Sequence, residues 1–507
     1  MDKIILIIRH AFVAFISGII IIILGFFFKL YLVHNLIDST FSLGIFALGI
    51  SMIEFISPFS SFGFGAVSAR YIPKWNINNN VNKINNFITF IGMFSLILSC
   101  LYAIVFYLNQ ENIFSMLDIN VNQKEFITFL SFLPFFLILM IVKNITTIIN
   151  QFLIGFQEVK KTVVFSELIG FPLKFILVVL FIYFGFDLKG YLYAEIISAI
   201  FILFAFVYVL KNIISKNYRF KISLDWINKR IIIYALTFFL LGFLAKFSNV
   251  IDKWLIQEYM SIKILGIYYM TFAFVDFLPF VLKSINKIFA PIISEMWEQK
   301  KLNELHSLYR FFTKWTLLLS YPMIFFIIFF SNDLLLLFGP EFIKGKNVLI
   351  ILSIAHAFSI SFGSVRTILQ MTDHHVKIFI VTVFKTLIVI LLLFILVPRY
   401  QMEGAAFSLA VGIIINNIFN YILLYRNLKF IPYSSDFWRV FMTIIFASIL
   451  LYLSFNYLSN FISNMHWYWL ILSIVYIYVI TIILSRILCF SKQDKVVVMN
   501  LLDKIKK

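Results

Sequence analysis

Long apolar runs are the feature that most limits how this chain folds. Its 507 residues hold about fourteen runs of roughly 20 mainly apolar residues, separated by short polar segments. These runs lie at approximately 11–33, 41–66, 87–108, 126–149, 163–184, 190–211, 231–257, 264–290, 315–330, 347–369, 378–397, 404–425, 440–457 and 467–485. A run of this length crosses the hydrocarbon core of a bilayer as a helix, whereas barrel strands would be shorter and alternate in polarity. The sequence therefore predicts an all-α integral membrane protein with about 14 transmembrane helices.

Composition supports the same class. The apolar fraction is 62% and the charged fraction only 13%, whereas soluble domains are about half apolar and a quarter charged. The first run, 11–33, has no small-residue cleavage site, so we expect it to remain as the first span rather than be removed as a signal peptide. Cys100 and Cys489 lie far apart in the sequence and indicate neither a disulfide framework nor a cysteine metal site.

The distribution of positive charge predicts the orientation. With alternate loops assigned to one face, 27 of the 42 lysines and arginines lie on the face that carries the termini, 6 lie on the other face and 9 lie inside spans. The positive-inside rule then places both termini in the cytoplasm and the chain in the cytoplasmic membrane. The densest cluster, 211–230, is expected to be a loop that contacts anionic lipid. The net charge of +18 is explained in this way, without nucleic acid as a partner.

An internal similarity predicts the domain organisation. The surroundings of Lys160 and Gly190 resemble those of Lys377 and Gly404, more than 200 residues later, as in transporters built from two duplicated halves. We expect an N-terminal six-helix lobe at 1–211, a basic cytoplasmic linker at 212–230 and a C-terminal six-helix lobe at 231–430. Two additional helices and a cytoplasmic tail would occupy 431–507. Chance similarity between apolar helices is the alternative explanation.

Five segments taken together resemble a known family. Residues 30–75 carry Gly44, the pair Gly63 and Gly65, and Arg70, and residues 248–274 carry an Asp252-Lys253 turn followed by Gly266 and Tyr268. Further segments are APIISEMW at 290–297, LLFGPEFIKGKNVLIIL at 336–352 and VPRYQMEGAAFSLAVG at 397–412. Their order and spacing are similar to the polysaccharide transporters, the lipid-linked oligosaccharide and O-antigen flippases, of the multidrug/oligosaccharidyl-lipid/polysaccharide exporter superfamily. The resemblance covers roughly residues 10–430.

The resemblance implies a fold and a function. It implies two six-helix lobes whose helices 1, 2, 7 and 8 border a cavity that opens alternately to each side of the membrane. It implies a substrate in which a polyprenyl pyrophosphate carries an oligosaccharide, flipped across the cytoplasmic membrane for glycan assembly. Membrane lipids would surround the protein, and a glycan polymerase or glycosyltransferases are candidate partners. No cofactor is implied; a sodium or proton gradient or the membrane potential would supply the energy.

Ionisable residues inside spans are the candidate site, because each costs roughly 2.5–3.5 kcal/mol at a helix centre. Those within about two turns of a span end reach the interface, which explains Lys143, Lys253, Lys287 and Arg366. On the family's arrangement, we expect the substrate diphosphate to bind cavity lysines, and acids to act as counter-charges or coupling sites. The expected diphosphate ligands are Lys29, Lys246, Lys283, Lys174 and Lys385, and the expected acids are Glu54, Asp276 and Asp252. The alternative role for each is an intramembrane salt bridge.

Two other motifs do not support a site. The segment GPEFIKGKN at 339–347 resembles a phosphate-binding loop, but its second glycine is one residue late and Asn347 replaces the required Ser or Thr. His374 and His375 lie in a short loop without a second pair of ligands, so no metal site is expected.

Three other functions are open to a membrane protein of this kind. A cationic multidrug exporter of the same fold should present acids, whereas these spans hold nine basic residues against five acidic ones. A membrane polymerase, ligase or oligosaccharyltransferase needs a catalytic surface, and the longest outward loop is only about 17 residues, so no enzyme activity is expected. A lipid II flippase shares both fold and substrate chemistry and stays as the nearest alternative.

Overall fold

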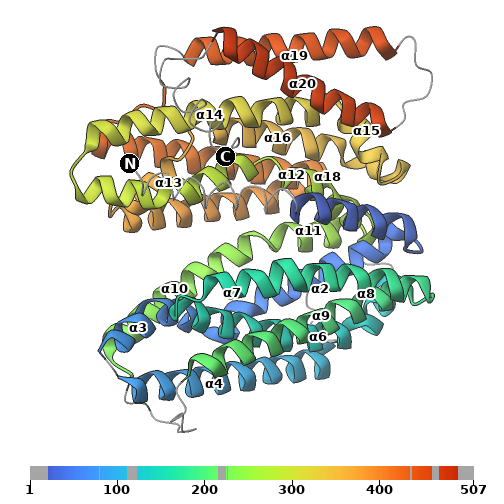
Figure 1. Ribbon diagram of the computed structural model, residues 1–507. Helices are drawn as coiled ribbons and strands as arrows, with labels where there is room; N and C mark the ends of the chain where they lie inside the picture. Colours follow the sequence, from blue (N-terminus) through green and yellow to red (C-terminus); the bar gives the residue numbers. More distant parts are fainter. Residues whose placement is uncertain are drawn as a thin grey trace. The chain divides into compact units, whose positions relative to one another are not determined.

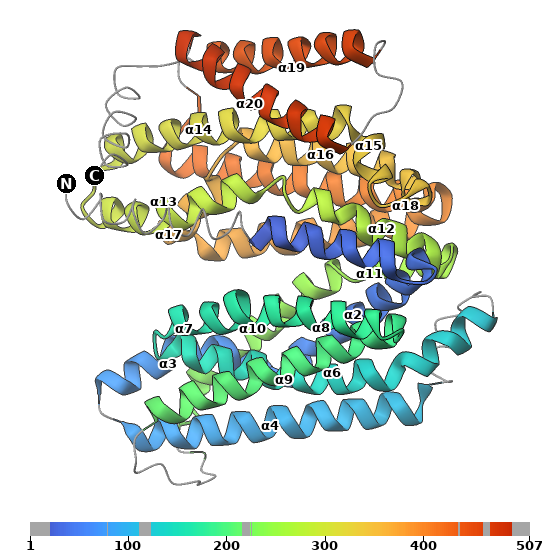
Figure 2. The ribbon, with the colours of Figure 1, turned by 45° about the vertical axis from the view of Figure 1, so that its right-hand side comes forward.

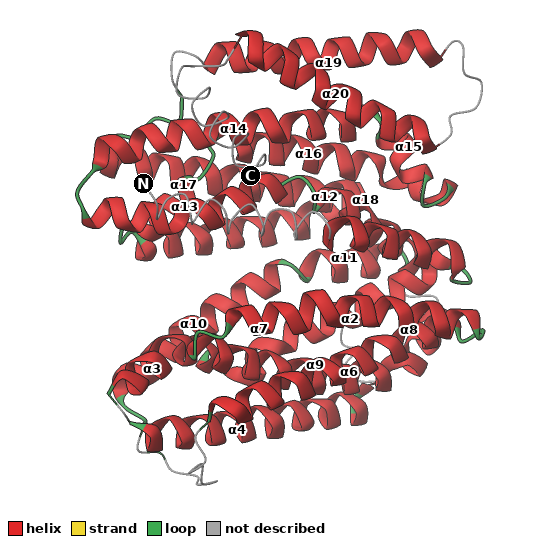
Figure 3. Cartoon of the chain, in the orientation of Figure 1, coloured by secondary structure: helices red, strands yellow, loops and turns green. Residues whose placement is uncertain are grey.

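The structure is a computed structural model of the chain, and the colours of Figures 1 and 2 follow the sequence from the N-terminus to the C-terminus. It describes residues 21–78, 80–110, 123–214, 224, 226–433, 437–459 and 467–488. Every regular element within these ranges is a helix, as Figure 3 shows. The prediction of an all-α membrane protein is confirmed.

The helices group into two compact units. The N-terminal unit comprises Tyr31–Tyr269 and Ile390–Gln401, and the C-terminal unit comprises Met1–Leu30, Met270–Val389 and Met402–Lys507. The predicted lobes at 1–211 and 231–430 stay a prediction, and the compact units assign residues 231–269 to the N-terminal unit. Both termini, and Lys216, Arg219 and Lys221 of the basic loop, lie outside the described residues.

The N-terminal unit is built around α6, which packs along both α4 and α9 (Figure 2). The helices of this unit are α2 (Ser39–Ser61), α3 (Phe64–Ile77), α4 (Val81–Leu108), α6 (Gln123–Gly155), α7 (Val159–Val163), the π-helix η1 (Val164–Gly170), α8 (Phe171–Tyr183), α9 (Asp187–Ile213), α10 (Lys229–Ser248) and α11 (Ile251–Tyr259). Its aromatic core includes Phe87, Phe152 and the buried Trp226, which ties the start of α10 to this unit.

The C-terminal unit is built around α14, along which α16, α19 and α20 pack (Figure 1). Its helices are α13 (Phe280–Glu298), α14 (Leu302–Phe329), α15 (Ser331–Leu336), the 3-10 helix η2 (Pro340–Gly345), α16 (Lys346–Ser361), α17 (Val365–Met371), most of α18 (His375–Leu428), α19 (Phe437–Ser459) and α20 (Trp467–Leu488). Phe289 of α13, Tyr309 of α14 and Ile368 of α17 meet in its core.

Two breaks divide long helices. The backbone of Gln401 in α18 is non-helical, with φ 56° and ψ −134°, so two helices meet there. α12 (Ile262–Val275), which begins in the N-terminal unit, is separated from α13 by Asp276–Pro279 and is bent against it by 51°. Pro279 is the last residue of the break and the N-cap of α13. Proline has no backbone N–H to donate, so α12 cannot continue through it as a regular helix.

Ten helices among the described residues are long and apolar enough to cross a membrane, and the bent pair α12–α13 brings the number to eleven. Shorter apolar helices cover Ile21–Asn35 and Trp438–Ser454. A straight α18 of 54 residues would measure about 80 Å, far more than the roughly 30 Å of a bilayer core. Its kink therefore fits two crossings, and the count of about fourteen spans stays a prediction.

Candidate functional site

Glu54 and Lys246 form an ion pair within the N-terminal unit. Glu54 is contributed by α2 and Lys246 by the last turn of α10, and Lys246 Nζ lies 3.7 Å from Glu54 Oε2. Their side chains are 38% and 42% exposed, so the pair is open to water or to a ligand. The sequence analysis expected both residues in a cavity, with Lys246 as a diphosphate ligand; the structure gives this lysine an acidic neighbour.

Aromatic side chains surround this ion pair. Phe55 of α2 contacts Phe243 and Phe247, which lie one turn apart on α10 and stack with an interplanar angle of 16°. Phe55 also contacts the Trp254 ring at a centroid distance of 4.9 Å, and the Trp254 indole N–H donates to Ser51 Oγ at 2.8 Å. Packing of α2 against α10 and α11 therefore holds the charged pair in place.

Asp252 is a buried anchor rather than an open counter-charge. It is 2% exposed, and its Oδ2 accepts a hydrogen bond from the Tyr268 hydroxyl at 2.8 Å. Lys253 Nζ lies 3.6 Å from Oδ1 and also donates to the Asn249 carbonyl oxygen. These contacts join α11 to α12, so the Asp252-Lys253 turn and Tyr268 of the family pattern act together in packing.

Lys174 lies in a charged triad. Its ammonium group is 3.1 Å from Glu195 Oε1, and Lys143 Nζ is 3.6 Å from Glu195 Oε2. The Glu195 side chain is only 9% exposed, so two cations from α6 and α8 neutralise one carboxylate on α9. From the sequence, Lys174 was expected to bind diphosphate and Glu195 had no assigned role. Glu195 was recognisable only as one of five intramembrane acids, because its partners lie on other helices.

The predicted spans of the C-terminal unit hold basic side chains without acidic partners among the described residues. Among the described residues, no acid lies within ion-pair distance of four of its basic side chains, Lys283, Lys287, Arg366 and Lys385. The ion pairs of Lys143, Lys161, Lys174, Lys246, Lys253 and Lys263 all belong to the N-terminal unit. Lys29 also belongs to the C-terminal unit, is half-buried and has interactions of its own.

Lys385 lies on the packed face of α18. It is half-buried, and the buried Val381 and Val389 precede and follow it by one turn. A Cβ at Gly412 would lie 2.3 Å from Val389 Cγ2 and 3.2 Å from Lys385 Cε, so the glycine makes room for both side chains between the two halves of α18. The charged side chain that acts on Lys385 is Arg366 of α17, which is a second cation.

Lys283 and Lys287 form a stripe on α13. They lie one turn apart and are exposed, whereas Phe289 and Ile293 on the opposite face are buried in the core of the unit. Charged side chains within spans face a bundle interior or a water-filled path, because contact with acyl chains is too costly. The stripe is therefore suited to face a polar path.

Asp276 lies at the break between α12 and α13 and is exposed. The backbone N–H groups of Asp276, Phe277 and Leu278 donate to carbonyl oxygens of the preceding turn, so the carboxylate is what this break offers to an ion or a ligand. Asp276 is one of the acids expected to act in coupling or as a counter-charge. The ion pairs of the described residues do not include it. Its role stays a prediction.

Buried amides add polar groups that the sequence analysis missed. Asn420 is 1% exposed, and neither its amide nitrogen nor its oxygen has a hydrogen-bond partner in the described part of the chain. Asn416, one turn earlier, and Asn286, next to the lysines of α13, each have an unpartnered side-chain oxygen. The four-residue spacing of Gly412, Asn416 and Asn420 places them on one helix face, and this spacing was the available signal.

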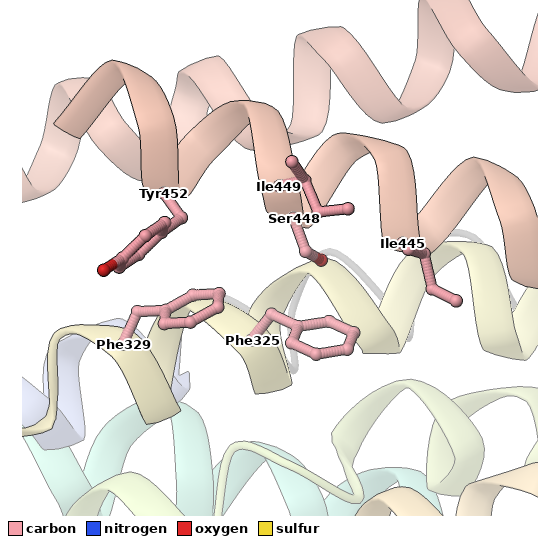
Figure 4. Close-up of a pocket in the computed structure, with 6 residues that line it drawn as sticks. All are labelled: Phe325, Phe329, Ile445, Ser448, Ile449 and Tyr452. Carbon is pink, nitrogen blue, oxygen red and sulfur yellow. The ribbon is translucent and has the colours of Figure 1, made fainter. Parts of the chain in front are cut away.

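Neither a metal cluster nor a charged pocket is found among the described residues. No group of three or more His, Cys, Asp or Glu residues within the described ranges could hold a metal ion. An apolar hollow of about 300 Å³ lies between α14 and α19 (Figure 4). Its lining is Phe325, Phe329, Ile445, Ser448, Ile449 and Tyr452. This lining carries no charge and suits hydrocarbon rather than a diphosphate.

Known proteins resemble this chain in sequence pattern and in fold. A family model described as polysaccharide biosynthesis protein matches residues 39–344, which is more than half of the chain. A search of curated proteins finds no match. The lipid II flippase MurJ in an inward closed conformation is similar in structure, with a TM-score of 0.70 and 17% identity over 94% of this chain and 98% of that one.

Two other solved structures are also similar. An inward-facing multidrug resistance MATE family transporter of the MOP superfamily gives a TM-score of 0.62 and 15% identity, over 80% of this chain and 98% of that one. The second is a MOP superfamily transporter from Pyrococcus furiosus, described as having a binding pocket of reverse polarity. Its TM-score is 0.58 and its sequence identity 17%, over 83% of this chain and 95% of that one. At these identities the likeness establishes a shared fold.

Proposed function

Because the chain belongs to the polysaccharide biosynthesis protein family, we propose that it flips a polyprenyl-pyrophosphate-linked oligosaccharide across the cytoplasmic membrane by alternating access. The polyprenyl tail is soluble in the bilayer, whereas the diphosphate and sugars need a polar path. The protein thus needs to carry only the head group through the membrane.

One observation supports an anionic head group above all others. Lys283 and Lys385, which reach to the interface does not explain, have no acidic neighbour within ion-pair distance among the described residues. Unneutralised cations in a membrane are costly unless they face water or meet a counter-charge, and a passing diphosphate supplies that charge. Lysine binds phosphate as a point charge, which suits a ligand that has to be released.

The ion pairs of Lys174 and Lys246 support a division of the predicted ligands into two groups. Lys283 and Lys385 keep the proposed role of binding the diphosphate, as does Lys29. Lys174 is held by Glu195 and Lys246 lies beside Glu54, so we propose that these two stabilise the N-terminal unit and tune its charge. Asp276 and the potential across the membrane stay candidates for energy coupling.

Two alternatives make different predictions. A lipid II flippase has the same substrate chemistry, and the fold shared with MurJ over nearly the whole of both chains keeps it as the second candidate. A cationic drug exporter would need acids where the C-terminal unit presents cations.

The direct test is transport by purified protein in vesicles. Three fluorescent substrates would be compared: an undecaprenyl-diphosphate oligosaccharide, lipid II and a cationic dye. The proposal predicts that the oligosaccharide lipid is moved and the dye is not. Transport of lipid II alone would replace the proposal with the second candidate, and transport of the dye alone would overturn both.

A further inference from the structure

His306 joins α14 of the C-terminal unit to the chain segment that follows α18. α18 ends at Leu428, and Phe430 just beyond it is 4% exposed and packs in the core of the unit. The imidazole ring of His306, near the start of α14, stacks on the Phe430 ring with a centroid distance of 4.7 Å and an interplanar angle of 3°. Arg310, one turn further along α14, donates from Nε to the Ile431 carbonyl oxygen at 3.3 Å. We call His306, Arg310, Phe430 and Ile431 the His306 latch.

One ring nitrogen in the latch lies within hydrogen-bond distance of both backbone groups of Ile431. The Ile431 N–H reaches His306 Nε2 at 3.0 Å, and the Ile431 carbonyl oxygen lies 2.9 Å from the same atom. A ring nitrogen accepts a hydrogen bond when it carries no proton and donates one when it does. The two hydrogen bonds therefore exclude each other, and the protonation of His306 decides which of them forms.

A neutral ring with its proton on Nδ1 pairs every polar group of the latch backbone. His306 Nε2 then accepts from the Ile431 N–H, while Arg310 Nε donates to the Ile431 carbonyl oxygen. We assign this tautomer because the other neutral form would place a second donor on that oxygen and leave the Ile431 N–H without its acceptor. The latch is therefore complete when His306 is neutral.

Protonation of His306 disturbs the latch in two ways. Nε2 becomes a donor that faces the Ile431 N–H, a second donor, so this amide loses its acceptor. The ring also becomes a cation beside Arg310, which is the charged side chain that acts on it from α14. From the segment after α18, the groups against the ring are the Phe430 ring and the Ile431 backbone, which carry no charge. An ordinary imidazole changes charge between about pH 5 and pH 8, so mild acid is expected to weaken the latch.

The latch fixes one end of the second half of α18, residues 402–428. On the predicted topology it lies beyond the cytoplasmic ends of spans 315–330 and 404–425, where it meets the pH of the cytoplasm. The same half of α18 carries Gly412, which makes room for Lys385. Packed helices shift by about 1–2 Å as rigid elements in switching transitions, so release of this end changes how Gly412 packs on Lys385.

We propose that His306 is a pH-sensitive latch, which holds the cytoplasmic end of α18 against α14 while its ring is neutral and releases it when the ring is protonated. Acid in the cytoplasm then slows transport of the head group, because Lys385 loses its fixed position beside Gly412. This consequence rests on the proposed flippase function, whereas the latch itself does not depend on the substrate.

Thermal unfolding tests the latch without a substrate. Wild type, His306→Gln and His374→Gln would be melted in detergent at about pH 7.5 and about pH 5.5, which span the titration of an ordinary imidazole. Glutamine accepts a hydrogen bond through its amide oxygen at both pH values. Acid is expected to lower the melting temperature of wild type by at least ~2 °C more than that of His306→Gln. His374→Gln is the matched control and should behave as wild type, because His374 is a histidine of the same unit whose Nδ1 lies 3.1 Å from Thr372 Oγ1 in its own loop.

Equal acid-induced shifts in all three proteins, or a smaller shift in His374→Gln alone, would overturn the latch. Arg310→Gln provides a second reading if His306→Gln does not fold. This variant removes the charge that repels the protonated ring, so its acid-induced shift should be smaller than that of wild type. A shift as large as that of wild type would count against the proposal.

Transport in vesicles tests the effect of the latch on function. The initial rate for an undecaprenyl-diphosphate oligosaccharide would be measured with the protein in one orientation, while the pH at its cytoplasmic face alone is lowered from about 7.5 to about 5.5. Wild type and His374→Gln are expected to slow at least ~3-fold, whereas His306→Gln keeps its rate. Equal slowing of all three proteins would contradict the effect on transport, even if the melting temperatures support the latch. No transport by any of them at the higher pH would contradict the flippase instead, and the melting temperatures would still decide whether the latch exists.

Discussion

Lys263 Nζ lies 2.7 Å from the Asp38 carboxylate, beside two places where α12 and α2 touch without intervening side chains. Cβ atoms built at Gly44 and Gly266 would each lie 1.9 Å from a backbone oxygen of the other helix, those of Ile262 and Thr40 respectively. The ion pair therefore caps a close helix contact within the N-terminal unit. On the predicted topology this contact lies at the outward end of both spans.

The glycine contact predicts a steric effect. Gly44→Ala or Gly266→Ala is expected to lower stability by about 1–3 kcal/mol, because a backbone oxygen cannot move aside as a side chain can. Thermal unfolding in detergent measures this change. Gly92→Ala in α4 is the control, since a Cβ there meets nothing within 4 Å. Equal stability of all three variants would mean that the two helices separate easily.

The Asp38–Lys263 pair predicts a dependence on pH. Burial raises the pKa of the Asp38 carboxyl, but the hydrogen bond and charge of Lys263, helped by Thr40, outweigh it and hold that pKa below the ordinary 3.8. A carboxylate with a lowered folded pKa contributes stability above its unfolded pKa and loses that contribution as the pH falls through the folded value. Lys263→Met should therefore be less stable than wild type at pH 7, by up to about 1 kcal/mol for so exposed a pair.

Melting temperatures of wild type and Lys263→Met across pH check this expectation. The difference should shrink below pH 3.8, where protonation of Asp38 removes from the wild type the ion pair that the variant already lacks. A difference that stays constant from pH 7 to pH 3 would show that Lys263 acts through packing instead.

Glu195 predicts a large loss of stability. Glu195→Ala leaves Lys143 and Lys174 without their shared counter-charge, and breaking a buried ion pair typically costs about 3–5 kcal/mol. The double variant Lys174→Met/Glu195→Leu should recover part of this loss, because no uncompensated charge is left at Lys174. Thermal unfolding of the purified variants is the measurement. If Glu195→Ala had normal stability but no transport, the triad would act on the substrate and would not be a structural ion pair.

Glu54 and Lys246 predict an effect of charge on transport. Lys246→Ala leaves Glu54 as an isolated carboxylate that repels an anionic head group, so we expect transport to fall at least ~10-fold, about 1.4 kcal/mol in barrier height. Glu54→Gln/Lys246→Ala removes the repulsion and should restore part of the rate. Transport assays on both variants at equal amounts in the membrane test this. A double variant slower than Lys246→Ala would assign Glu54 a direct role, as in ion coupling.

The fold was predictable from sequence to the extent that the bilayer dictates it. Long apolar runs predict helices whatever their partners, and those around Phe87 and Phe289 were assigned to spans and lie in helices. The break at Gln401 was expected from the polar residues between two runs. The assignment of 231–269 to a compact unit depends on packing that no local pattern encodes.

The sequence was enough to predict which intramembrane residues form the candidate site, but not which of them form ion pairs. Lysines within spans stand out by their cost, but the choice between ligand and salt bridge depends on a partner on another helix. Lys174 and Lys385 look alike in sequence, each a lone cation between apolar residues. Only the structure puts Glu195 next to the first and Gly412 next to the second.

The central claim is that unpaired cations of the C-terminal unit carry the anionic head group. The most direct measurement is the initial rate at which Lys283→Gln/Lys385→Gln flips an undecaprenyl-diphosphate oligosaccharide in vesicles, beside wild type and at matched protein content. The account predicts a fall of at least ~100-fold, equivalent to about 2.7 kcal/mol, with a wild-type melting temperature. A wild-type rate in this double variant would contradict the account.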